Sequence, residues 1–446
     1  MKRRILPLLL TLCLLLGLAV PAAAENTVPN YPKENGFTYF IQNGKATIVG
    51  YEDNTITELV IPATLGGCPV DDTLEQAFHD YPNLKKVVLP DQPLTLSLSC
   101  FENCTALEEI NLHDGIDLGA YSFAGCKSLK TAYLPAPRNP YGRLTSGTFF
   151  DCRSLESVEI GEGLAEIPSN TFGACWSLKE VVIPEGVRGI GYAAFQDCFS
   201  LTDVTLPVSL DIVSKEAFVG CKDTLTIHGV KGSVAEHAAD QLGFPFAETE
   251  YPQLFADVPA GQYYSAPVVW AAMNGITKGK TTTSFVPGDQ CTRAQMVTFL
   301  WRFLGCPDST IIPDMLPFED IDKNAYYIDA LTWAYEKGIT QGTGEHTFSP
   351  NKTVTRGQVV MMLFRADKQD PYAGYETAGF TDLREGAYYV DAVNWAAQQG
   401  IVTGYADKTF RPDAPCTRAH IVTFLYRNTA PYYNNSNWGV GKPYIC

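Results

Sequence analysis

Three arginines in the C-terminal half stand at matching places in a repeated pattern: Arg293, Arg356 and Arg418, which are 63 and 62 residues apart. A threonine stands directly before each arginine, and an apolar run such as MVTFLWRFL follows it. Threonine is a good helix N-cap, so each arginine is expected in the first turn of a helix. Unpaired N–H groups and the positive end of the helix dipole favour an anion there. Because a guanidinium can bind a carboxylate through two hydrogen bonds, the pattern predicts three equivalent anion sites.

The residue three places after each threonine decides whether the cap can be completed by a second hydrogen bond. Gln295 and Gln358 stand three residues after their threonines and can complete a capping box. His420 takes this place in the third copy and departs from the pattern, which leaves its cap open. The alternative role for each arginine is an ion pair with an aspartate of its own or a neighbouring repeat. One copy alone would favour that role, whereas three equivalent copies favour a ligand.

Two sets of aromatic residues recur at the same period. The tryptophans lie mid-helix among apolar residues and are expected in the core: Trp270, Trp333 and Trp395. The tyrosines begin the same helices and are the better candidates for stacking on a sugar: Tyr264, Tyr327 and Tyr389. The predicted glycan site therefore combines these tyrosines with the three arginines.

Each copy is built from four motifs in the same order. The openings read FADV, FEDI and FTDL, the helix ends GITKG, GITQG and GIVTG, the loops FVP, FSP and FRP, and the caps TRAQ, TRGQ and TRAH. This triplet resembles the S-layer homology (SLH) family over its full length. The resemblance implies an all-α bundle of three repeats with pseudo-threefold symmetry. It also implies non-covalent binding to a secondary cell-wall polysaccharide, often one with pyruvate ketals, whose carboxylate the arginines would reach.

A second, shorter period fills the N-terminal half. Phenylalanines recur every 22 to 26 residues: Phe78, Phe101, Phe123, Phe149, Phe172, Phe195 and Phe218. In most copies a cysteine and then a leucine follow at three-residue steps, and the leucine opens a short alternating strand such as LKEVVIP. A unit of this length with one strand is typical of leucine-rich repeats. The pattern resembles the BspA-like leucine-rich-repeat family from about residue 36 to 246. The resemblance implies a solenoid of short parallel strands with an irregular convex side.

The strands of this solenoid should expose alternate residues along one sheet. The expected outward residues are Glu108, Glu109, Asn111, Thr131, Tyr133, Lys179, Glu180 and Thr205. Such a face either is plainly solvated or binds a partner. The segment KGSVAEHAADQLGFPF is expected to form an amphipathic helix that closes the C-terminal end of the solenoid.

Cysteines recur at one position of the solenoid: Cys104, Cys126, Cys152, Cys175, Cys198 and Cys221. In-register stacking would place them about 4.8 Å apart with parallel Cβ vectors, outside the roughly 3.5–4.5 Å that a disulfide prefers. We therefore expect a ladder of buried thiols. Cys291 and Cys416 replace Val354 of the second SLH copy and are also expected in the core. The pairing of Cys68, Cys100, Cys306 and Cys446 stays open.

The termini and the charge balance limit the domain boundaries and the kinds of partner. Residues 1–24, with a basic start, an apolar run and an AAA site, are predicted to be a signal peptide. The predicted domains are the solenoid at 25–248, SLH repeats at 253–306, 316–368 and 378–428, and a tail at 429–446.

The two halves of the chain differ in charge. Residues 25–252 hold 14 basic and 31 acidic residues, and residues 253–446 hold 16 basic and 18 acidic residues. This balance argues against a nucleic acid or an anionic membrane as partner and leaves the near-neutral half to meet an anionic wall polymer.

No pattern in the chain predicts catalysis, a cofactor or a metal. HExxH, GxSxG and P-loop motifs are absent, and the six histidines share no metal-ligand spacing. Beyond the signal peptide, no apolar stretch is long enough for a membrane span. The sequence predicts an exported, non-catalytic surface protein that the triplet holds on the wall polysaccharide and whose solenoid meets an unknown protein or glycan partner. The alternatives are a wall glycan hydrolase with an unrecognised carboxylate pair and a structural S-layer subunit.

Overall fold

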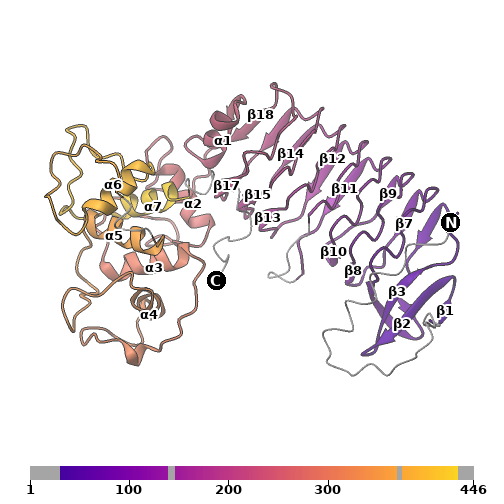
Figure 1. Cartoon of the computed structure of the whole chain (residues 1–446), viewed down its shortest axis with the longest axis horizontal. Coiled ribbons are helices and arrows are strands. Elements are labelled where there is room, and N and C mark those ends of the chain that lie inside the picture. Colours follow the sequence, from indigo (N-terminus) through magenta and orange to yellow (C-terminus); the bar gives the residue numbers. More distant parts are fainter. Residues whose placement is uncertain (1–30, 139–145, 369–373, 430–446) are drawn as a thin grey trace.

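A computed structural model describes residues 31–138, 146–368 and 374–429. The predicted signal peptide and nearly all of the predicted tail lie outside these residues. The chain forms an arched solenoid of short strands, followed by a helical unit that packs against the last coils of the solenoid (Figure 1). The predicted architecture, a leucine-rich-repeat solenoid followed by an all-α SLH unit, is confirmed.

The strands that begin near the repeat leucines form the upper side of the solenoid in Figure 1. They are β4 (Glu58–Val60), β7 (Lys86–Val88), β9 (Glu109–Ile110), β11 (Thr131–Leu134), β12 (Ser157–Ile160), β14 (Glu180–Val182), β16 (Asp203–Thr205), β18 (Thr226–Gly229) and β19 (Phe246–Glu248). They form two sheets, β4 to β9 and β11 to β19, within which successive strands pair in parallel, as Val181 of β14 does with Val204 of β16. Both of these side chains are buried, whereas the neighbouring Val182 is 65% exposed, so the strands alternate between core and solvent as predicted.

A second line of strands lies on the opposite side, where sequence reasoning expected irregular structure. These strands are β6 (Cys68–Thr73), β8 (Leu94–Leu96), β10 (Ile116–Leu118), β13 (Glu166–Ile167), β15 (Gly189–Ile190) and β17 (Ile212–Val213). Most of them contain only two or three residues, too few to show an alternating pattern. The repeat therefore has two strands where sequence reasoning found one.

The two ends of the solenoid are closed differently. At the N-terminal end, β1 (Lys33–Glu34), β2 (Phe37–Gln42) and β3 (Lys45–Tyr51) form an antiparallel cap, and β5 (Thr64–Leu65) pairs with β6. At the other end lies α1 (Val234–Leu242), which Ser233 caps and Gly243 ends in the left-handed region, with φ 77°. This is the closing helix that the sequence predicted.

A column of phenylalanine rings runs through the solenoid core. From Phe78 to Phe218 each ring stacks on the next, with centroids 5.1 to 5.8 Å apart. The residue two places after each phenylalanine has a positive φ, such as Asn103 at 61° and Gly125 at 74°. Asn, Asp and Gly tolerate this conformation best, which explains why they dominate the position.

The predicted thiol ladder runs beside this column, and its six cysteines are free. Each sulfur donates a hydrogen bond to the carbonyl of a phenylalanine one repeat earlier, as Cys175 Sγ does to Phe149 O at 3.3 Å. Burial raises the pKa of the Cys104 and Cys221 thiols to about 12 and holds that of Cys175 well above its usual range. The ladder therefore consists of protonated donors that join neighbouring repeats. Of the cysteines whose pairing was open, Cys68 and Cys100 are free and Cys306 is disulfide-bonded.

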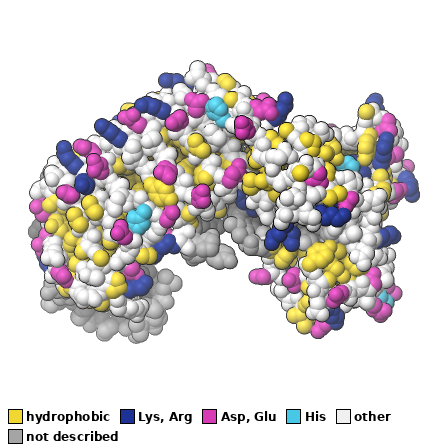
Figure 2. All heavy atoms as spheres, turned by 180° about the vertical axis from the view of Figure 1, so that it is seen from behind, with side chains coloured by type: hydrophobic (Ala, Val, Ile, Leu, Met, Phe, Trp, Pro, Cys, Tyr) yellow, Lys and Arg dark blue, Asp and Glu magenta, His cyan; other side chains and the backbone are white. Residues whose placement is uncertain are grey.

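The outward face of the upper strands carries ion pairs between neighbouring repeats. Lys179 contacts Glu156 at 2.8 Å, and Lys86 contacts Glu58 at 3.6 Å. Cationic and anionic side chains alternate along this rim (Figure 2). Exposed ion pairs of this kind contribute little stability, so the face agrees with the plain solvated alternative.

The helical unit has two long helices per repeat: α2 (Ser265–Met273) and α3 (Arg293–Phe303), α4 (Ile328–Glu336) and α5 (Arg356–Ala366), α6 (Val390–Gln398) and α7 (Arg418–Arg427). A short 3-10 turn, η2 (Pro313–Met315), lies between the first two repeats. The packed helix pairs are α3 with α4, α5 with α6 and α7 with α2, so every pair joins two repeats and the third repeat closes on the first. At the centre, Cys291 N–H donates to Cys416 O, Cys416 N–H to Val354 O, and Val354 N–H to Cys291 O, each at 2.9 Å. Both cysteines are fully buried, which confirms that they lie in the core.

The helical unit meets the solenoid through α2 and α7. Trp270, which is fully buried, donates through Nε1 to Asp211 Oδ1 at 2.9 Å. The other oxygen of Asp211 accepts from Arg188 Nη2 at 2.6 Å. Tyr426 donates to Gly232 O at 2.9 Å, and Asn274 to Ser209 O at 3.2 Å. The solenoid therefore covers the first SLH tryptophan with polar groups as well as apolar ones.

Candidate functional site

The three predicted arginines occupy equivalent buried positions between repeats. Arg293, Arg356 and Arg418 are 2%, 4% and 6% exposed. Each Nε donates to the phenylalanine carbonyl of the next repeat's F-x-P loop: Arg293 to Phe348 at 2.8 Å, Arg356 to Phe410 at 2.9 Å and Arg418 to Phe285 at 2.8 Å. Each guanidinium also lies over that phenylalanine ring, 4.6 to 4.9 Å from its centre. The arginines therefore join the repeats in a closed cycle.

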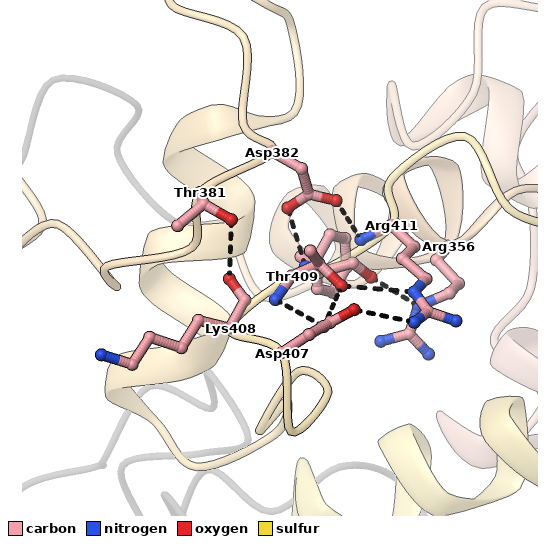
Figure 3. Close-up of polar contacts among 8 residues, drawn as sticks. Arg356, Thr381, Asp382, Asp407, Lys408, Thr409 and Arg411 are labelled. Atoms are coloured by element: carbon pink, nitrogen blue, oxygen red, sulfur yellow. Dashed lines mark hydrogen bonds and ion pairs between the residues drawn. The ribbon is translucent and has the colours of Figure 1, made fainter.

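The aspartate of each opening motif holds the loop that the arginine contacts. Asp382 accepts from the backbone N–H groups of Phe410 and Arg411 at 2.8 and 2.7 Å (Figure 3). Asp257 and Asp320 hold the loops of the first two repeats in the same way. The middle residue of each F-x-P loop has a positive φ of 57 to 59°, which is unfavourable for a side chain such as Val286. The aspartates thus fix a strained turn that presents its carbonyl to the arginine.

The predicted helix N-termini are correct, but their N–H groups are not available to an anion. All three helices have complete capping boxes, and His420 completes the third by accepting from Thr417 N–H at 3.4 Å. The next N–H groups donate to the neighbouring repeat, as Arg293 N–H does to Lys352 O at 2.9 Å. The expectation of unpaired first-turn N–H groups is therefore wrong, because closure of the three repeats uses them. Any anion here must be bound by side chains.

Most terminal N–H donors of the three guanidinium groups have no described acceptor. Among the described residues no carboxylate lies within ion-pair distance of Arg293, Arg356 or Arg418, so the alternative of a plain Arg–Asp pair is wrong. Of their terminal nitrogens, only Arg293 Nη2 has a described acceptor, the Thr340 hydroxyl at 3.3 Å. Arg418 Nη2 is buried and has no hydrogen-bond partner. Burial lowers the pKa of Arg293 and Arg418, which remain cations. A buried cation without a counter-ion is costly, so these groups favour an anionic ligand.

A cavity of about 250 Å³ marks the groove at Arg293. It is lined by parts of all three repeats: Arg293 from the first, Gln358 and Arg365 of α5 from the second, and Tyr388 from the third. Arg365 has counterparts in Arg302 and Arg427, at the same 63- and 62-residue spacing, which sequence reasoning overlooked. Their period was the signal that could have found them. The groove therefore holds two arginines, two glutamines and a tyrosine.

The tyrosines in this groove are not the ones predicted. Tyr327 and Tyr389 are 6% and 3% exposed, so they do not present a ring face to a sugar, and Tyr264 is half-buried. The preceding residue is exposed in each repeat: Tyr263 at 54%, Tyr326 at 64% and Tyr388 at 57%. Each helix begins at a Tyr-Tyr pair, and sequence reasoning chose the inner residue because it adjoins the apolar run. The expectation for the tryptophans is confirmed, since Trp270, Trp333 and Trp395 are all buried.

Two protein-family models match the regions that these features define. A BspA type leucine rich repeat region, in six copies, matches residues 51–142 and 143–232. The S-layer homology domain matches residues 254–297, 317–360 and 379–421. The chain is a BspA-type leucine-rich-repeat region followed by three S-layer homology domains. Both predicted resemblances are confirmed, and domains of these kinds place the protein at the cell surface, held on the wall.

Curated relatives match through part of their length. An S-layer protein of Bacillus thuringiensis subsp. finitimus is 26% identical over 203 residues, which are 45% of this chain and 23% of that protein. A cellulosome-anchoring protein of Acetivibrio thermocellus is 25% identical over 154 residues, 34% of either chain. An amylopullulanase of Thermoanaerobacterium thermosulfurigenes is 28% identical over 185 residues, 41% of this chain and 10% of that enzyme. Glycosidase relatives of this kind match only through their S-layer homology portions.

Solved leucine-rich-repeat structures align with the solenoid half. The T. pallidum leucine-rich-repeat protein is 26% identical, and the match covers 49% of this chain and 98% of that one with a TM-score of 0.33. A leucine-rich-repeat protein from Eubacterium ventriosum is 18% identical, and the match covers 50% of this chain and 53% of that one with a TM-score of 0.29.

Within the described residues, no helix is both long and apolar enough to cross a membrane.

Proposed function

We propose that the SLH unit binds an anionic polysaccharide of the cell wall in the grooves between its repeats. The observation that carries this proposal is the set of three buried guanidinium groups without carboxylate partners among the described residues, one of which has a fully buried, unpartnered Nη2. Arg365 supplies a second cation to the Arg293 groove, Arg302 and Arg427 stand at the equivalent positions of the other repeats, and the exposed tyrosines supply a ring for the sugar. The predicted pyruvate ketal has the carboxylate that a guanidinium fork fits.

Arginine-to-glutamine variants separate the ligand from the fold. A glutamine amide nitrogen can take the place of arginine Nε, so it keeps the hydrogen bond to the phenylalanine carbonyl and removes the terminal donors. The triple variant R293Q/R356Q/R418Q should stay folded by circular dichroism and lose most sedimentation with wall sacculi. Each charge-assisted hydrogen bond that the variant removes is worth roughly 1.5–3 kcal/mol, and multivalency masks only part of a single loss.

A matched variant controls for net charge. Lys323, Lys337 and Arg384 are exposed cations of the same unit that pair with carboxylates, and none of the three lines the cavity. Their triple replacement by glutamine removes the same charge and should leave binding close to wild type. If the two triple variants bind sacculi equally well, the arginines act only in closing the three repeats.

We further propose that the solenoid displays an adhesion surface. Trp176 and Phe199 are 39% and 43% exposed on adjacent repeats, with ring centroids 6.0 Å apart, and Arg153 lies over Trp176 at 4.0 Å. Exposed Trp and Arg are enriched where proteins bind each other. W176S/F199S should weaken binding of the protein to a panel of extracellular-matrix proteins, while K179S on the charged rim should not. Equal binding by both variants would remove this surface from consideration.

A further inference from the structure

The three grooves differ in one loop of the third repeat. Tyr405 follows the GIVTG motif, and Arg411 is the middle residue of the FRP loop. Val286 and Ser349 occupy the position of Arg411 in the other repeats, so a cation stands here in one copy of three. The ring of Tyr405 contacts two guanidinium groups, with Arg411 Cζ 4.0 Å and Arg356 Cζ 5.0 Å from its centre.

Arg411 is held in place rather than left to move in solvent. Its Nε donates to Thr409 Oγ1 at 3.2 Å, and its Nη2 donates to Asp407 Oδ2 at 3.0 Å (Figure 3). Asp407 in turn accepts from Thr409 N–H at 3.1 Å, and Asp382 accepts from the backbone N–H of Arg411. The side chain is 50% exposed. A planar guanidinium is thus oriented beside the groove with terminal N–H donors still facing solvent.

One of the two guanidinium groups at Tyr405 has a carboxylate partner and the other has none among the described residues. Asp407 compensates Arg411, whereas Arg356 is 4% exposed and has no carboxylate within ion-pair distance among the described residues. The same groove gains a wall of rings, because exposed Tyr263 stacks on His420 with centroids 6.0 Å apart. In the other two repeats a glutamine stands in place of His420. The Arg356 groove therefore has one guanidinium, Arg411, and two rings, Tyr405 and His420, at positions where the other two repeats carry neither.

We propose that Arg411 is a second anion-binding residue of the Arg356 groove, and that this groove binds the acidic wall sugar more tightly than its two counterparts. The inference rests on the proposed function, because the anion is the same carboxylate- or phosphate-bearing polysaccharide. Arg356 binds the anion from within the groove, Arg411 adds N–H donors from the groove edge, and the ring of Tyr405 contacts both guanidinium groups. Tyr263 offers its exposed ring to the sugar.

The natural repeats supply the variants that test this role. Ser349 holds the same left-handed backbone, with φ 58° against 59° for Arg411, so R411S introduces no new strain. R411S should weaken sacculus binding about fivefold, the scale of one partly exposed charged contact. S349R transfers the arginine to the second repeat and should strengthen binding by a similar factor. R411K keeps the charge without the fork and should fall between wild type and R411S.

Binding is measured as an isotherm of the full protein with wall sacculi, and thermal unfolding is followed for each variant. Competition with soluble polygalacturonate or with poly(glycerol phosphate) distinguishes a carboxylate from a phosphate as the anion. If R293Q/R356Q/R418Q loses binding while R411S and S349R match wild type, Arg411 only stabilises its loop and this inference fails by itself. If the triple variant keeps full binding, the proposed function has failed instead. Weaker binding by R411S at an unchanged unfolding temperature, with a gain from S349R, supports the inference.

Discussion

The two halves of the chain use repeats in opposite ways. In the solenoid each repeat contacts the next through a stacked ring, a thiol donor and parallel strands, and the ends need the β1–β3 cap and α1. In the SLH unit the third repeat returns to the first through Arg418 and Phe285, through Cys291 and Cys416, and through α7 and α2. Damage to one repeat of an open array should destabilise mainly that repeat and its two neighbours, whereas a closed cycle should fold or fail as one unit.

The largest effect is expected from opening the cycle. Removal of the third SLH repeat, residues 378–428, takes away the partners of α2 and α5 and the acceptor of Arg356 Nε. We expect the two remaining repeats to lose hydrogen-exchange protection while the first repeats of the solenoid keep theirs. Native protection in α3 and α4 of the shortened protein would show that the repeats fold independently.

A buried charge in the solenoid should destabilise the protein less than removal of the third SLH repeat, and its effect should stay near the substituted repeat. Cys175 is fully buried and donates to Phe149 O, so C175K would place an ammonium among apolar neighbours. We expect a loss of about 3–5 kcal/mol in the free energy of unfolding, against about 1 kcal/mol for C175S, which keeps a donor. Urea unfolding with hydrogen exchange measures both size and extent. If C175K unfolds the SLH unit as well, the contrast between open and closed arrays is wrong.

The junction between the halves should give a smaller effect. D211A removes the acceptor of Trp270 Nε1 and the carboxylate paired with Arg188, two buried groups. We expect a loss of about 2–4 kcal/mol, a shift in tryptophan fluorescence, and faster proteolysis between residues 247 and 254. D203A is the control, because Asp203 pairs with His228 on the exposed rim. Equal protease sensitivity of the two variants would show that the junction does not hold the halves together.

The smallest effect on the free energy of unfolding is expected from acidic pH, through the protonation of His420. Burial and the nearby Arg356 lower the pKa of His420 to about 4 from its ordinary 6.5. The unfolded chain therefore takes up a proton at His420 before the folded chain does. As pH falls from about 6.5 to 4, this group should reduce the free energy of unfolding, and below that range its contribution should level off. H420Q, with the residue of the other repeats, should show a weaker decline in urea midpoint across this window. Parallel declines would mean that His420 is protonated equally in both states.

The sequence predicted what is periodic and missed what depends on closure. The Phe, Cys and Leu ladder and the Thr–Arg caps follow from spacing, so both arrays and the free thiols were predicted. The occupation of first-turn N–H groups was not, because Lys352 and Asp289 supply those acceptors from other repeats. The sequence could not show which member of each Tyr-Tyr pair is exposed, because the two side chains are identical and adjacent. Arg411 was overlooked because it breaks the period instead of following it.

The most direct test of the account is a crystal structure of the protein with an acid-released fragment of the wall polysaccharide. We expect an acidic group of the sugar within hydrogen-bond distance of the terminal nitrogens of Arg293, Arg356 or Arg418, with Tyr263, Tyr326 or Tyr388 against the sugar ring. Occupancy should be highest in the Arg356 groove, beside Arg411. A fragment bound elsewhere on the molecule, with all three guanidinium groups unchanged and in contact only with protein, would contradict it.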